Sequence, residues 1–166
     1  MMATKKTENV ENVEITEKKA VNVLDLLLGS DCGKIQTPFK DVEISRLSEA
    51  FGSPFIVRCM ALTPNEYEDV QDAAINIQGK DVDLDMNLLQ NLTVIESVRF
   101  VNVDEAGNKS TGGLLLKSAD LMSKFKAPTP KELCRALFLS GEVANMYNVI
   151  SALSGFSDQA VKEVKN

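Results

Sequence analysis

The chain has 166 residues, of which 44% are hydrophobic and 25% charged, and its formal net charge is −6. A chain of this length and composition can bury enough apolar surface to fold without a disulfide or a metal. Histidine is absent and the three cysteines lie far apart, which excludes a Cys/His zinc site and a Ser-His or Cys-His dyad, while the acidic balance argues against nucleic-acid binding.

The first 18 residues alternate acidic and basic side chains and contain few apolar ones. This pattern predicts a flexible charged tail and not a signal peptide. The remaining residues, 19–166, are expected to form a single domain. A short apolar helix over 20–28, with Gly29 as its C-cap, is the first element predicted in it. No apolar run is long enough to cross a membrane, so no membrane contact is expected.

Two segments in the N-terminal half have the composition of strands. Val42 and Ile44 alternate with polar residues, and residues 55–62 are rich in bulky and β-branched side chains. Gly52, Ser53 and Pro54 interrupt the chain between them. We therefore predict a small antiparallel β-hairpin with a long connection, in which residues 46–51 either form a loop or contribute a helical turn.

Two helices are predicted in the middle of the chain. Thr63-Pro64-Asn65-Glu66 has the residues of a capping box, and the helix that it begins is expected to end near Gly79. The apolar residues that this helix would place on one face are Tyr67, Val70, Ala74 and Ile77. Residues 80–85 are expected to form an acidic loop before the second helix, over 86–99.

Residues 104–113 are polar and glycine-rich, and a mobile loop is expected there. Ser118 is predicted to cap a short helix that ends near residue 124. The last third contains helix starts at Thr129-Pro130 and at Ser140-Gly141, with Gly155 as a left-handed C-cap and a final helix after residue 157. The predicted fold class is α+β, predominantly helical, with a small antiparallel β-hairpin in the N-terminal half.

No segment carries a recognisable chemical motif. The chain lacks a phosphate-binding loop, and the alternating acids of residues 81–85 do not continue into a calcium-binding loop. No catalytic, metal-binding or cofactor-binding residue is therefore assigned, and no cofactor is expected.

Apolar helical faces are the remaining candidates for function. Each face can either pack in the core or bind a partner, and the core interpretation is favoured because amphipathic helices usually bury their stripes internally. The candidate partner-binding residues are Leu24, Leu27 and Leu28 near the N-terminus, and Val143, Met146, Tyr147 and Ile150 near the C-terminus.

Several short blocks, in a fixed order, resemble one known family. The blocks are VLDLLLG (23–29), VEISRLSE (42–49), ALTPNEYE (61–68), LTVIE (92–96) and the segments 124–133 and 139–156. In this order and spacing they resemble the XkdN-like tail assembly chaperones of tailed phages and phage-derived contractile particles. The chain departs from the family pattern in the longer, glycine-rich segment 104–113 and in Ser140, where proline is expected.

The resemblance implies a non-enzymatic assembly factor. Its expected partner is the tape-measure protein, with the tail-tube protein as a second expected partner; self-association is left open. Its expected location is the bacterial host cytoplasm, and it is not expected in the mature particle. The alternative is a structural tail or connector subunit that the particle retains. An enzyme is the third hypothesis, disfavoured by the absence of histidine and of phosphate-loop motifs.

Overall fold

The computed structural model describes residues 22–165, which form two units: residues 22–36 and the body, residues 37–165. The first unit contains helix α1, Val23–Gly29, and a short 3₁₀ turn, Cys32–Lys34. α1 begins because the Asn22 side chain accepts a hydrogen bond of 2.8 Å from the backbone N–H of Leu24. Ser30, and not Gly29, is the C-cap, so the expected glycine cap is wrong. The predicted tail and residues 20–21 of this helix lie outside the described residues.

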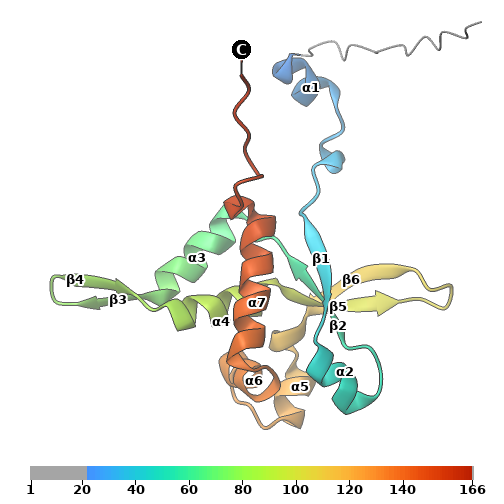
Figure 1. The fold of residues 1–166 in the computed structure, drawn as a ribbon, viewed down its shortest axis with the longest axis vertical. Coiled ribbons are helices and arrows are strands. Elements are labelled where there is room, and N and C mark those ends of the chain that lie inside the picture. The colour runs from blue at the N-terminus through green and yellow to red at the C-terminus, as the bar shows by residue number, and fades with distance from the viewer. Residues whose placement is uncertain (1–21, 166) are drawn as a thin grey trace, which may run out of the picture. The chain divides into compact units, whose positions relative to one another are not determined.

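The body contains a four-stranded antiparallel sheet (Figure 1). Its strand order is β1-β2-β5-β6, and the strands are β1 Phe39–Glu43, β2 Ile56–Met60, β5 Val98–Val103 and β6 Lys109–Leu114. β1 pairs with β2, so the predicted hairpin is confirmed, but it makes up only half of the sheet. Its connection contains helix α2, Ser45–Phe51, which ends at the left-handed Gly52 with φ of 63°.

The segment expected to be a loop over 104–113 is a turn only over 104–108, and residues 109–113 belong to strand β6. Asp104 and Asn108 close a short turn, in which the backbone N–H of Asp104 donates to the Asn108 carbonyl at 3.0 Å. Beyond the turn β6 pairs with β5, with an irregularity in the register between Arg99 and Val101. Gly112 fits this point because a Cβ there would lie 2.9 Å from the Cβ of Phe100. Gly112 permits this close approach between strands, so its presence does not indicate a loop.

The helix predicted from Thr63 also differs from the structure. The Thr63–Glu66 capping box is present, but helix α3, Pro64–Ala74, is shorter than predicted. The residues that follow form a β-hairpin, β3 Ile75–Gln78 and β4 Asp81–Leu84, in place of the last helical turn and the acidic loop. Gly79, with φ of 65°, makes the turn of this hairpin. Its β-branched residues alternate with polar ones, a period of two that the sequence analysis overlooked.

The remaining helices agree with the prediction to within a few residues. They are α4 Met86–Ser97, α5 Ala119–Lys124, α6 Pro130–Leu137 and α7 Ser140–Ser151, with a 3₁₀ turn at Leu115–Lys117 and a π-helical turn at Ala152–Phe156. Gly155, with φ of 92°, takes the left-handed conformation predicted for it. Residues 157–165 contain no helix, so the final helix expected after residue 157 is wrong.

One hydrophobic core joins the sheet to the helices. α4 packs against α3, α6 and α7, and both α4 and α7 contact β2. The largest fully buried apolar side chains in this core are Leu116, Leu133, Ile150, Val94 and Val98. The fold class is therefore α+β as predicted, with more strands than expected.

Candidate partner-binding surfaces

α1 exposes every one of its apolar side chains. Leu24, Leu27 and Leu28 have exposed fractions of 59%, 58% and 78%. The helix contains only 7 residues, which is too short for stability from backbone hydrogen bonds alone. Within residues 22–36 no residue is buried, so nothing in this unit covers the leucines. They form the most apolar exposed segment of the described chain, and we call them the α1 leucines.

The second predicted set lies mainly inside the body. Val143, Met146 and Ile150 are 6%, 3% and 0% exposed and belong to the hydrophobic core. Tyr147 is half-buried and packs against the same core. The first three residues therefore have the core role that the sequence analysis favoured, and in this structure they offer no surface to a partner.

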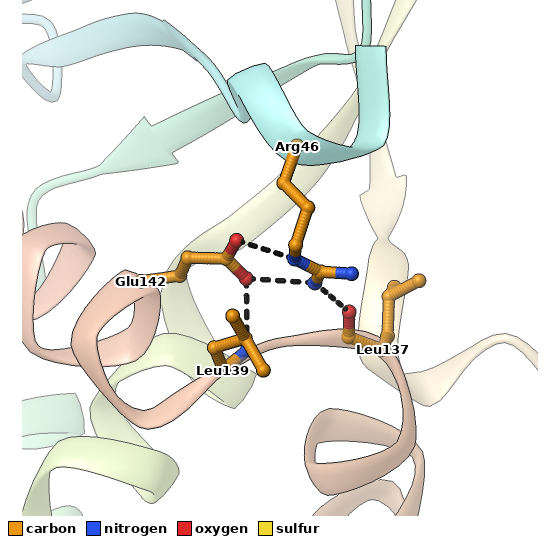
Figure 2. Close-up of polar contacts among 4 residues, drawn as sticks. All are labelled: Arg46, Leu137, Leu139 and Glu142. Atoms are coloured by element: carbon orange, nitrogen blue, oxygen red, sulfur yellow. Dashed lines mark hydrogen bonds and ion pairs between the residues drawn. The ribbon is translucent and has the colours of Figure 1, made fainter. Parts of the chain in front are cut away.

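A partly exposed ion pair joins α2 to the start of α7 (Figure 2). The Arg46 guanidinium on α2 donates to both carboxylate oxygens of Glu142, at 2.8 and 2.9 Å, and to the Leu137 carbonyl at 2.9 Å. Glu142 also accepts a hydrogen bond of 2.8 Å from the backbone N–H of Leu139. This arrangement holds the α6–α7 corner without the proline that the family resemblance implies at Ser140.

The same contacts change the acidity of the carboxylate. The hydrogen bonds from Arg46 are the main reason that the pKa of Glu142 lies below its usual value, and the bond from the Leu139 backbone acts in the same direction. Glu142 therefore stays ionised to a lower pH than an unpaired glutamate would.

Arg58 on β2 is buried, 5% exposed, within a similar set of contacts on the sheet. It donates to both carboxylate oxygens of Asp41, at 2.8 and 3.1 Å, and to the hydroxyl of Thr111 at 2.9 Å. Its guanidinium carbon lies 3.9 Å from the centre of the Phe39 ring, a cation–π contact. Hydrogen bonding by Arg58 lowers the pKa of Asp41. All the groups that contact Arg58 in this cluster belong to the sheet itself, so the role of the cluster is to join β1, β2 and β6.

Four phenylalanines surround an apolar groove that the sequence analysis missed. Phe51 and Phe125 are 64% and 40% exposed, and Phe100 is 37% exposed. Phe51 stacks on the half-buried Phe55, with ring centres 6.1 Å apart. We call this feature the aromatic groove; its volume is about 260 Å³. No local sequence pattern could have revealed it, because α2, β5 and the end of α5 each supply one side chain.

The described residues offer little for catalysis. Burial raises the pKa of the Cys59 thiol to about 12 and that of the Cys134 thiol to about 11, so neither is a thiolate at neutral pH. Among residues 22–165 no group of three or more His, Cys, Asp or Glu side chains is placed to hold a metal ion. Nor does this part of the chain contain a helix that is both long and apolar enough to span a membrane.

Comparison with known proteins identifies the family. The model of the phage XkdN-like tail assembly chaperone proteins matches residues 24–166. The chain belongs to this family. The match begins within α1 and includes the whole body.

The fold has also been seen in a crystal structure. The protein yqbn superposes with a TM-score of 0.54 at 18% sequence identity, covering 84% of this chain and 100% of that one. At this identity the likeness concerns the fold alone. A comparison with curated proteins returned no match.

Proposed function

We propose that this tail assembly chaperone binds the tape-measure protein, keeps it soluble and promotes assembly of the tail tube around it. Family membership over residues 24–166 carries the proposal, and the α1 leucines support it. The location that follows is the bacterial host cytoplasm, with the chaperone leaving before the particle matures.

The physical basis is the protection of apolar surface. A long helical protein that will later be enclosed by a tube exposes apolar stripes until the tube forms, and such stripes favour aggregation. The α1 leucines, with exposed fractions of 58% or more, provide a complementary apolar surface on a short helix. A net charge of −6 would keep the resulting complex soluble.

Release has to be possible when the tube protein arrives. Contacts made by a helix of 7 residues bury little area, so each chaperone binds weakly and many copies act together along the partner. No step in this mechanism requires catalysis or a cofactor.

Co-expression tests the proposal. The tape-measure protein is produced alone and together with this chain, and the soluble fraction is analysed by size-exclusion chromatography with light scattering. We expect the tape-measure protein to be insoluble alone and to elute with several copies of the chain when they are co-expressed. A tape-measure protein that remains insoluble in both cases contradicts the proposal.

A second measurement distinguishes the proposed chaperone from the rival hypothesis, a structural tail or connector subunit. Quantitative mass spectrometry of purified particles should find this chain absent or far below one copy per particle. Stoichiometric presence would favour the structural subunit.

A further inference from the structure

The whole net charge of the chain resides in one region. Residues 64–85 contain seven of the 24 acidic residues and one of the 18 basic residues, which leaves seventeen of each sign elsewhere. The region comprises α3 and the β3–β4 hairpin. We call the hairpin alone, residues 75–84, the arm. Within the described residues none of these seven carboxylates takes part in an ion pair. Their field therefore faces solvent and favours a basic partner.

The arm has one apolar face and one acidic face. β3 and β4 form a separate two-stranded sheet, and Figure 1 shows it extending away from the rest of the body. Because opposed residues of a hairpin share a face, the register places four apolar side chains together: Ile75, Ile77, Val82 and Leu84. The opposite face carries Asn76, Gln78, Asp81 and Asp83.

Leu84 packs against the core of the body, but the outer part of the apolar face is not covered. Ile77 and Val82 are opposed across the strands and are 70% and 69% exposed, and Ile75 is 39% exposed. A two-stranded hairpin is at best marginally stable in water, and a third strand or a packed helix is what usually stabilises it. The arm has neither among the described elements.

The arm's edges are available for hydrogen bonding. The two-residue turn at Gly79 and Lys80 makes Gln78 and Asp81 a hydrogen-bonded pair. Away from the turn, opposed residues then alternate between non-hydrogen-bonded and hydrogen-bonded pairs. The bond of 2.9 Å from the Asp85 backbone N–H to the Ala74 carbonyl continues this alternation. The backbone groups of Ile77 and Val82 consequently point outward from the hairpin.

We propose that the arm binds an extended protein segment that alternates apolar and basic residues, which adds to one edge as a third strand. The outward backbone groups would supply the main-chain hydrogen bonds of strand addition. The partner's apolar residues would extend the apolar face of Ile77 and Val82. Its lysines or arginines would lie beside Asp81 and Asp83, where opposite charges on neighbouring strands attract. This proposal does not depend on the identity of the tape-measure protein as a partner.

Peptide binding to the full chain tests the proposal. The probe is a fluorescent peptide of sequence Lys-Ile-Lys-Val-Lys-Ile-Lys-Val, measured by fluorescence anisotropy at physiological ionic strength. We expect Asp81→Lys with Asp83→Lys to weaken binding about tenfold or more, because two attractive cross-strand pairs become repulsive. The matched control, Glu68→Lys with Asp69→Lys on α3, changes net charge equally and should weaken binding far less. Equal effects of the two variants would show general charge attraction and overturn the proposal.

Modified peptides keep the test independent of whether a variant folds. A peptide N-methylated at its lysines and another N-methylated at its Ile and Val residues block opposite edges of the added strand. Exactly one of the two should lose binding to the unchanged protein. A block isomer, with the lysines in one half and the apolar residues in the other, should bind weakly. Undiminished binding of both methylated peptides, or of the block isomer, contradicts strand addition.

Discussion

Helices α1 and α7 both carry apolar side chains, but they place them in opposite environments. α7 places Val143, Met146 and Ile150 at spacings of three and four residues, and all three are buried. α1 has apolar residues at five of its 7 positions, and all of them are exposed. A narrow stripe on one face suits a helix that packs on a core. The apolar face of α1 is wide, interrupted only on the side of Asp25 and Gly29, and because it is exposed it suits a segment that a partner covers. The comparison separates residues needed for folding from residues available for binding.

The largest predicted effect concerns the buried side of this comparison. Ile150→Ala should lower the free energy of unfolding by about 2–5 kcal/mol, because Ile150 is fully buried and the smaller side chain leaves a cavity in the core. Leu27→Ala, which removes a similar apolar group from α1, should change it by less than about 0.5 kcal/mol. Urea denaturation followed by circular dichroism measures both. Comparable losses for the two variants would show that α1 is covered within the folded chain.

The sheet beneath α7 provides the next test. Arg58→Met should cost about 2–3 kcal/mol, because Asp41 loses its charged hydrogen-bond donor and the Phe39 ring loses its cation–π contact. The double variant Arg58→Met with Asp41→Leu should recover part of the loss, as it leaves no carboxylate without a partner. Urea denaturation of the single and the double variant measures the free energy of unfolding of each. A double variant that is less stable than the single one would contradict the explanation.

A smaller effect is expected at the corner where α7 begins. Arg46→Met should lower the free energy of unfolding at neutral pH by less than Arg58→Met does, because the pair with Glu142 is partly exposed and is screened by solvent. The pKa of Glu142 is lowered in the folded state, so the pair's contribution is present above the unfolded-state pKa and is lost as the pH falls through the folded-state pKa. The stability difference between the two proteins should therefore shrink below about pH 4. A constant difference down to pH 2 would rule out this role for Glu142.

Local signals in the sequence predicted most helix starts correctly, although the Gly29 cap and the final helix were wrong. Thr63, Ser118 and Thr129 each cap the helix predicted for them, and Gly155 takes the left-handed conformation. Each of these features is formed by residues a few positions apart in the chain, so a short stretch of sequence is enough to predict it.

Features that depend on distant residues were predicted poorly. The sequence predicts a loop where β6 lies, because the role of Gly112 depends on its close approach to Phe100 on another strand, which no local pattern reveals. The aromatic groove combines side chains from separate elements, and the ion pair of Arg46 with Glu142 joins residues 96 positions apart. For α1 and α7 the apolar pattern was recognised correctly, but only the packing of the body showed which of the two is covered.

The most direct test of the central claim changes the α1 leucines alone. The triple variant Leu24→Ser, Leu27→Ser and Leu28→Ser is co-expressed with the tape-measure protein, and soluble complex is quantified by size-exclusion chromatography with light scattering. The variant should fold with unchanged stability, since these side chains are exposed, yet recover much less soluble tape-measure protein than the unchanged chain. Full recovery by a correctly folded triple variant would contradict the assignment of partner binding to α1.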